Sequence, residues 1–194
     1  MSEPRIVPAN RASRADLDVI MREGGDANSC RCQWFKLPQK DWTATGREAR
    51  DDALVAQAGC DRPGATATSG LVAYVGDEPA AWVAVEPRVA YPRLRTARIP
   101  WSGRDEDRDD PGVWAVTCFV VRRDFRGRGL AKALAIAAVA HARAGGATAV
   151  EGYPRVEGGS VSDLYVGSRE IFAAAGMIEV SRPTPGRAVM RVEW

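Results

Sequence analysis

The sequence lacks a long apolar run and contains little of several residue types that mark special classes of protein. No stretch approaches the ~20 apolar residues that a membrane-spanning helix requires. The segment Met1–Arg5 has no apolar core of the kind found in a signal peptide. The one histidine and four scattered cysteines are too few for a disulfide framework or a typical zinc centre. We therefore expect a cytoplasmic protein that uses no membrane, no metal ion and no structural disulfide.

A strong excess of charge is absent as well. The 27 Lys and Arg residues against 25 Asp and Glu leave a formal charge of +2, which is too balanced for a bulk nucleic-acid binder. The 194 residues are 45% hydrophobic, which is enough to bury the core of one large domain. No repeat or change of composition divides the chain, so we expect a single domain over residues 1–194.

The remaining patterns alternate between helix and strand and predict a mixed α/β fold. One helix is predicted to begin after Ser13, and a second covers residues 47–58 and stops at Gly59. Turn residues 76–79 join two β-prone runs, which predicts a hairpin. Residues 87–112 predict a long loop, and its acidic run from Asp105 to Asp110 is interpreted either as solvated or as a lid that would favour cationic amines.

A strand, a glycine-bearing turn and a helix follow one another in the most informative stretch. Residues 113–121 are nearly all apolar, as expected of a strand buried on both faces, and residues 130–144 have helical spacing. The first turn of a helix leaves backbone N–H groups unpaired, and the helix dipole places about half a positive charge there. Gly127 and Gly129 have no Cβ atoms, so a phosphate oxygen can approach the main chain. The turn is therefore predicted to bind a diphosphate.

The residues around the two glycines indicate which diphosphate. A dinucleotide-binding G-x-G-x-x-G pattern would need a small residue at Lys132, and the G-x-x-x-x-G-K-[ST] pattern is absent. Arg126 to Ala131 instead reads R-x-x-G-x-A. Here the chain resembles the GNAT superfamily of N-acetyltransferases, signature [Q/R]-x-x-G-x-[G/A], and looks like a largely uncharacterised bacterial branch of it. Residues 113–153 match the family's strand, turn, helix and strand in order and length.

The resemblance implies an α/β (α+β) fold with a mixed, mostly antiparallel sheet of six to seven strands. The sheet would be splayed at its central strands and flanked by about four helices. Residues 1–70 would form a variable acceptor region, and residues 71–194 the hairpin, the CoA-binding core and the C-terminal strands. Acetyl-CoA would be the acyl donor. A primary amine on a small molecule, a peptide or a protein would be the acceptor, attacking directly in a ternary complex, and a homodimer is a further expectation.

The resemblance also assigns cofactor-binding residues. The pyrophosphate of coenzyme A would be bound by the backbone amides of Arg126, Gly127, Arg128, Gly129, Leu130 and Ala131. The pantetheine arm would pair like an extra strand alongside Phe119, Val120 and Val121. An N–H group of that strand would polarise the thioester carbonyl, as in an oxyanion hole.

The acid and the base are indicated less directly. The family's usual tyrosine corresponds to Phe172, which cannot donate a proton. Tyr165 is the alternative acid, although a purely packed aromatic or protonation by solvent would also fit. Glu151 is the first choice of base and Glu86 the second, with a water chain as a replacement for either. The departure at Phe172 also leaves open a catalytically silent acyl-CoA sensor or scaffold.

The segment from Cys30 to Trp42 is the most unusual part of the chain. Its C-x-C pattern is interpreted as buried thiols rather than a metal site. Trp34, Phe35 and Trp42 are predicted to wall the acceptor pocket. The lone histidine, His141, lies on the apolar side of a predicted helix and is expected to be packed in the core.

Overall fold

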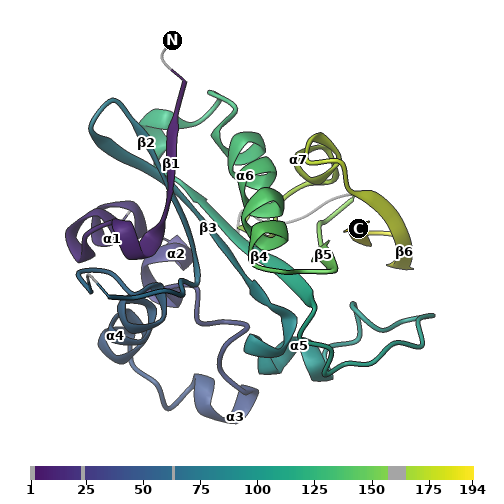
Figure 1. Ribbon diagram of the computed structural model, residues 1–194. Coiled ribbons are helices and arrows are strands. Elements are labelled where there is room, and N and C mark those ends of the chain that lie inside the picture. The colour runs from purple at the N-terminus through teal and green to yellow at the C-terminus, as the bar shows by residue number, and fades with distance from the viewer. Residues whose placement is uncertain (1–2, 23–24, 63, 157–164) are drawn as a thin grey trace.

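A seven-stranded sheet runs through the molecule in the computed structural model, which describes residues 3–22, 25–62, 64–156 and 165–194 (Figure 1). The strands are β1 (Arg5–Pro8), β2 (Gly70–Val75), β3 (Glu78–Pro87), β4 (Val113–Val121), β5 (Ala149–Gly152), β6 (Ile178–Thr184) and β7 (Arg187–Glu193). The α-helices are α1 (Arg14–Met21), α2 (Gly25–Cys30), α3 (Gln39–Trp42), α4 (Arg47–Ala58), α5 (Pro92–Thr96), α6 (Leu130–Ala144) and α7 (Arg169–Ala174). Short 3-10 turns are η1 (Ala9–Arg11), η2 (Arg88–Ala90) and η3 (Arg123–Phe125).

The strand order is β1-β2-β3-β4-β5-β7-β6, and every neighbouring pair is antiparallel except β4 with β5. This mixed, mostly antiparallel sheet confirms the predicted fold class. The structure has more helices than the four or so expected, and several of the additional ones are short. The prediction of one continuous loop over residues 87–112 was wrong, since Pro92 stands at the first position of α5, where its fixed φ favours a helix start.

The predicted helix boundaries at Ser13 and Gly59 are confirmed, and both have a local cause. The Ser13 hydroxyl accepts a hydrogen bond from the Asp16 N–H, and the Asp16 carboxylate accepts one from the Ser13 N–H, each at 3.1 Å. This reciprocal pair satisfies two backbone donors at the start of α1. Gly59 ends α4 with a φ of 72°, in the left-handed region that glycine adopts at little cost.

Two groups of helices cover opposite faces of the sheet (Figure 1). The helices α6 and α7 pack on one face, where Leu134 and Phe172 belong to the same buried cluster as Val83 of β3. The helices α1, α2 and α4 pack on the other face, where Leu17 and Leu54 meet β2, β3 and β4. The sheet is therefore buried on both sides at its centre, as the apolar run of β4 requires.

A β-bulge interrupts the alternation of side chains halfway along β4. Its pairing with β3 skips Thr117, which is therefore the extra residue of a β-bulge. Before and after the bulge, Val116 and Phe119 pack on the α6 side of the sheet. Cys118 and Val120 belong to the cluster on the α1 side. In a strand that alternated regularly through Thr117, Cys118 would share the α6 face with Val116, two positions earlier.

The strands β4 and β5 separate beyond this point. Their parallel pairing covers only Val113–Val116 of β4 against Ala149–Gly152 of β5. Residues 117–121 continue β4 past the end of β5, with no pairing to that strand. The predicted splaying of the central strands is confirmed, and it leaves a stretch of backbone edge in the middle of the sheet.

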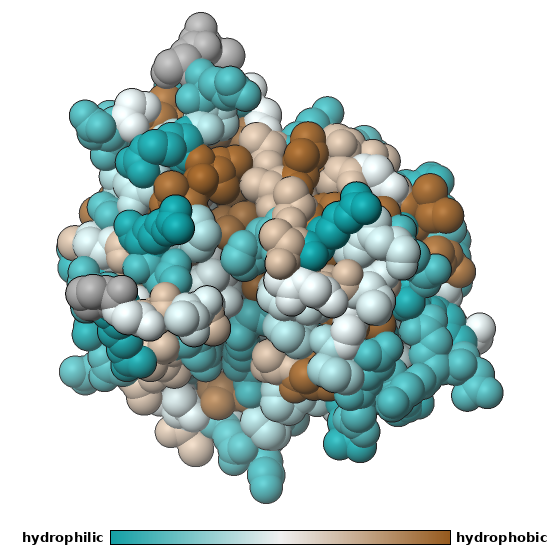
Figure 2. Space-filling model, viewed as in Figure 1, coloured by the Kyte–Doolittle hydropathy of each residue, from teal (hydrophilic) through white to brown (hydrophobic). Residues whose placement is uncertain are grey.

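The surface is mainly polar on the face that Figure 2 shows, with apolar side chains in smaller groups. Hydrophilic side chains cover the lower right of that view, where the segment after α5 protrudes in Figure 1. Within the described ranges, no helix is long and apolar enough to cross a bilayer.

Candidate active site

The turn between β4 and α6 has the open backbone that the sequence predicts. Gly127 and Gly129 have φ values of 73° and 76°, which side chains with a Cβ rarely adopt. A Cβ built at either glycine would meet no atom within 4 Å, so the space in front of the main chain is clear. Gly129 is the N-cap of α6 and supplies no side-chain cap to the first N–H groups of that helix. These donors and the helix dipole fit a diphosphate.

Two arginines of the turn stabilise its backbone through hydrogen bonds to carbonyl groups. The Arg126 Nε atom donates to the Val121 carbonyl at 3.1 Å, and the Arg128 Nη2 atom donates to the Asp124 carbonyl at 2.8 Å. The Arg128 guanidinium also lies over the Phe125 ring, 5.1 Å from its centroid. The turn is thereby fixed in shape while its guanidinium groups remain close to the glycines. A pocket of about 400 Å³ opens here, lined by residues that include Val121, Gly127, Gly129, Leu130, Ala131 and Lys132.

The predicted pantetheine strand lies between this turn and the bulge. Phe119 is buried against Phe172, with ring centroids 5.7 Å apart, and Val120 is buried on the opposite face. Val121 lines the pocket at the turn. The side chains of these three residues are thus held by the two cores, while the backbone edge of this segment extends past the end of β5. An extended ligand could pair with that edge.

A second pocket, of about 440 Å³, lies at the bulge on the α2 side of the sheet. Thr117 and Cys118 line it from β4, and Tyr165 lines it from the segment before α7. The predicted acceptor walls are here as well: Trp34, Phe35 and Trp42 all line this pocket. Nothing in the residue pattern indicates that one strand would contribute to both pockets, because the bulge at Thr117 leaves no mark in that pattern.

Tyr165 is half-buried in this second pocket. Burial raises the pKa of its hydroxyl, and the charge of Asp26 adds to the increase, whereas a hydrogen bond with the Ala27 backbone and the charge of Arg126 oppose it. The hydroxyl is therefore protonated at neutral pH, and Tyr165 shares this pocket with Thr117 and Cys118 of the bulge. The predicted acid and the predicted cofactor strand thus come together, whereas Phe172 is fully buried on the α7 side.

Glu151 lies elsewhere, in a buried cluster of charges. Its carboxylate is fully buried and accepts hydrogen bonds from Arg88 at 3.2 Å, Arg191 at 2.6 Å, Tyr153 at 2.8 Å and the guanidinium of Arg104. Burial alone would raise the pKa of Glu151, but the hydrogen bonds and charges of the arginines outweigh it and lower that pKa. A carboxylate held in this way is a weak proton acceptor, so this geometry favours a structural role and the catalytic role stays a prediction.

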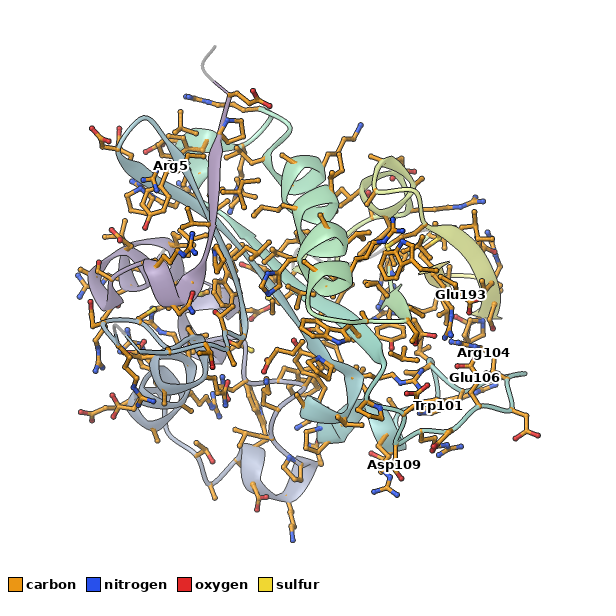
Figure 3. All side chains as sticks on the ribbon, viewed as in Figure 1. Arg5, Trp101, Arg104, Glu106, Asp109 and Glu193 are labelled. Carbon is orange, nitrogen blue, oxygen red and sulfur yellow. The ribbon has the colours of Figure 1, made fainter. Side chains whose placement is uncertain are left out.

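The same cluster ties the segment after α5 to the C-terminal strands. Glu106 of that segment pairs with Arg191 of β7 at 3.0 Å, and Arg191 also pairs with Glu193 at 2.5 Å. Figure 3 shows Arg104, Glu106 and Glu193 side by side at this junction. The cluster is therefore built from segments far apart in the sequence.

Glu86 has the opposite electrostatic environment. Burial raises the pKa of its carboxyl, and the ion pair with Lys36 offsets only part of that increase. The Tyr91 hydroxyl lies close enough to both Glu86 and Thr117 for each to shift the pKa of Tyr91. That hydroxyl is buried without a hydrogen bond of good geometry to any described side chain. Tyr91 therefore stands between Glu86 and the Thr117 wall of the second pocket, and nothing in the sequence pattern singled it out.

The remaining candidate residues, the cysteines and His141, lie in surroundings that indicate a structural role. Cys30, Cys32 and Cys118 are free thiols at the second pocket, with the Cys32 and Cys118 sulfur atoms in contact. In the described part of the chain, no group of three or more His, Cys, Asp or Glu residues is arranged to hold a metal. His141 meets Trp114 edge-on, with centroids 6.0 Å apart, and burial lowers the pKa of its imidazole. It lies outside both pockets.

Comparisons with known proteins bear on the family and the fold. The model of the acetyltransferase (GNAT) family matches residues 32–155. No curated protein sequence matches the chain. Among solved structures, the PaiA N-acetyltransferase of Thermoplasma acidophilum in complex with coenzyme A is 11% identical over the whole of both chains, with a TM-score of 0.55. The GNAT domain of PAT from S. lividans is 17% identical over 100% of this chain and 92% of that one, with a TM-score of 0.53.

A further solved structure contains kanamycin as well as coenzyme A. The aminoglycoside acetyltransferase AAC(6')-Ib, in complex with coenzyme A and kanamycin, is 16% identical over 98% of this chain and 95% of that one. Its TM-score is 0.56. At these identities the likeness establishes a common fold.

Proposed function

Because the chain belongs to the GNAT acetyltransferase family, we propose that it transfers an acetyl group from acetyl-CoA to a primary amine by direct attack in a ternary complex. The observation that carries this proposal is the position of the two pockets on one strand. Val121 lines the pocket at the glycine turn, and Thr117 lines the pocket at the bulge. Four residue steps of a strand span roughly 13 Å. A donor anchored by its phosphates at the turn would therefore run along β4 to the acceptor pocket.

Coenzyme A fits the residues that line this path. The backbone N–H groups from Arg126 to Ala131 would hold the pyrophosphate, since the two glycines leave the main chain accessible. The edge of Phe119, Val120 and Val121 would hold the pantetheine arm. Acetyl-CoA supplies an activated acetyl group, and an N–H of this edge would polarise its carbonyl. Holding the thioester and the amine in adjoining pockets contributes to the rate by proximity.

The proton transfers are assigned to side chains around the bulge. Tyr165 is the proposed acid for the departing thiolate, because its hydroxyl is protonated and lines the acceptor pocket. Glu86 is the proposed base, acting through Tyr91 and Thr117, because its pKa is raised toward the working pH. Glu151 becomes the second choice, since its pKa is lowered and its oxygens are taken up by arginines.

A small-molecule amine is the proposed acceptor, because the second pocket is of ligand size and lies inside the fold. The competing function is a silent acyl-CoA sensor, which the phenylalanine at position 172 would favour. Purified protein with acetyl-CoA and a panel of amines separates the two when free thiol is followed over time. We expect thiol release that depends on the amine. Binding of acetyl-CoA with no thiol release for any amine would favour the sensor.

A further inference from the structure

The aromatic walls of the acceptor pocket are already covered by cations. The Trp34 and Trp42 rings meet edge-on, with centroids 5.0 Å apart. The Arg93 guanidinium lies 3.9 Å from the Trp34 centroid, and the Arg50 guanidinium lies 3.6 Å from the Trp42 centroid. A ring whose face holds a guanidinium offers less attraction to a second cation on that face. These rings therefore present apolar surface to a ligand rather than an open cage for an ammonium group.

Two thiols that line the pocket, those of Cys30 and Cys118, are uncharged at neutral pH. Burial raises the pKa of Cys30 to about 11. The contact with Cys32 and burial together raise the pKa of Cys118 well above its usual value. Neutral thiols behave as small, polarisable apolar groups. They extend the apolar surface from the tryptophans to the bulge and add no negative charge that would attract a polycation.

Carboxylates are scarce among the described residues that line the same pocket. Asp26 is the one acidic side chain among its described lining residues, and Arg187 adds a positive charge. None of the acidic residues from Asp105 to Asp110 lines the pocket. Figure 3 shows Glu106 beside Arg104 in the region of the buried charge cluster, whereas Asp109 lies lower in the view, beyond Trp101, and pairs with Arg95. The acidic lid that would favour cationic amines is therefore not supported, and a second cation on the acceptor would find little compensation.

An apolar pocket also helps the chemistry of a single amine. Transfer from water to apolar surroundings disfavours the charged form and so lowers the pKa of an amine. The neutral amine is the nucleophile, and Thr117 and Cys118 place this pocket against the proposed thioester position. We propose that the acceptor is a small monoamine with an aromatic or apolar body and no second cationic group. This inference rests on the proposed acetyl transfer and names its substrate class.

The experiment compares 2-phenylethylamine with 1,4-diaminobutane and kanamycin. Binding of each amine to the protein saturated with coenzyme A is measured by calorimetry, and thiol release from acetyl-CoA is measured in parallel. We expect 2-phenylethylamine to bind about ten- to hundredfold more tightly than the polycations, the gain of burying one aromatic ring. The kcat/KM values should follow the same order. Tighter binding of 1,4-diaminobutane or kanamycin, or no binding of 2-phenylethylamine, would overturn the acceptor class.

A matched pair of variants tests whether 2-phenylethylamine binds in the pocket that Trp34 lines. Trp34 and Trp194 are 40% and 41% exposed, and each carries an arginine on its ring face. We expect Trp34→Ala to weaken 2-phenylethylamine binding about tenfold, and Trp194→Ala to leave it unchanged. Equal effects of the two variants would overturn the assignment. Selective binding of 2-phenylethylamine without thiol release for any amine would uphold the acceptor pocket and refute only the proposed catalysis.

Discussion

The sulfur atoms of Cys32 and Cys118 lie 3.2 Å apart, although 86 positions separate the two residues in the sequence. Atoms this close can be joined by a disulfide with little movement of the backbone. Diamide takes up the two thiol hydrogens, so we expect it to link Cys32 to Cys118 and to inhibit acetyl transfer reversibly. Peptide mapping without reductant identifies the linkage. Cys60→Ser should behave as the wild type, whereas a linkage through Cys30 instead would contradict the contact.

Gly129 is the residue at which one substitution tests donor binding. We expect Gly129→Glu to weaken the binding of coenzyme A at least a hundredfold, because a carboxylate would stand at the positive end of α6 where the phosphates are placed. Calorimetry measures the affinity. Gly103→Glu is the matched control, since Gly103 also has a positive φ and open space around it. Equal affinity of the two variants would refute the phosphate assignment.

Substitution of Glu86 tests its proposed role as the base through the pH dependence of the rate. The raised pKa of Glu86 means that its basic form appears at a higher pH than for an ordinary glutamate. We therefore expect the kcat/KM value to rise with pH through that raised pKa. Glu86→Gln should lower kcat about a hundredfold and remove this rise. A full loss of activity in folded Glu151→Gln, with Glu86→Gln unaffected, would return the role of base to Glu151.

Tyr165 tests the proposed acid. We expect Tyr165→Phe to lower kcat by about tenfold or more, while the KM for acetyl-CoA changes little because the ring is kept. Steady-state kinetics separate the two parameters. Tyr74→Phe serves as the control, since the Tyr74 hydroxyl bonds to Asp16 at 2.8 Å, outside both pockets. Similar losses in both variants would indicate a general effect of losing a buried hydroxyl.

Glu151 is expected to stabilise the fold through its ion pairs with arginines. At pH 7, Glu151→Gln should lower the free energy of unfolding by about 3 kcal/mol, as when a buried ion pair loses one partner. The native pKa of Glu151 is lowered, so this stability is present above the unfolded pKa and is lost as the pH falls through the native one. The difference between wild type and variant should therefore shrink in acid.

Urea unfolding at several pH values measures this difference. The control is Glu193→Gln, because Glu193 is largely exposed and also pairs with Arg191. We expect that variant to change stability by no more than about 0.5 kcal/mol. A loss as large as that of Glu151→Gln would mean that burial of the carboxylate is not what makes the cluster stabilising.

Features with a local cause could be predicted from the sequence. The Ser13 cap, the stop at Gly59 and the turn with Gly129 depend on residues within a few positions of one another, and each is where the pattern predicts it. The grouping of aromatic residues in the N-terminal region could be predicted as well, and Trp34 lines the second pocket. Its role as a wall of an acceptor site stays a prediction.

Features that depend on long-range contacts could not be predicted. The environment of Glu151 is set by Arg88, Arg104 and Arg191, which come from three different segments. Its own neighbours in the sequence give no sign that its carboxylate is fully buried. The link from Glu86 through Tyr91 was missed for the same reason, since it forms only when η2 packs beside β4.

The bulge at Thr117 has a consequence for how such a pocket can be gained or lost. The site depends on the number of residues in β4 rather than on the chemistry of the residue that is inserted. Substitution of Thr117 would alter the pocket wall but leave the strand register in place. Removal of Thr117 would close the bulge and leave Val116 and Cys118 in regular alternation opposite Val85 and Ala84, so Cys118 would keep its face while the pocket lost the Thr117 wall. A change in length could therefore remove this wall and straighten the strand in a single genetic event that no point mutation reproduces.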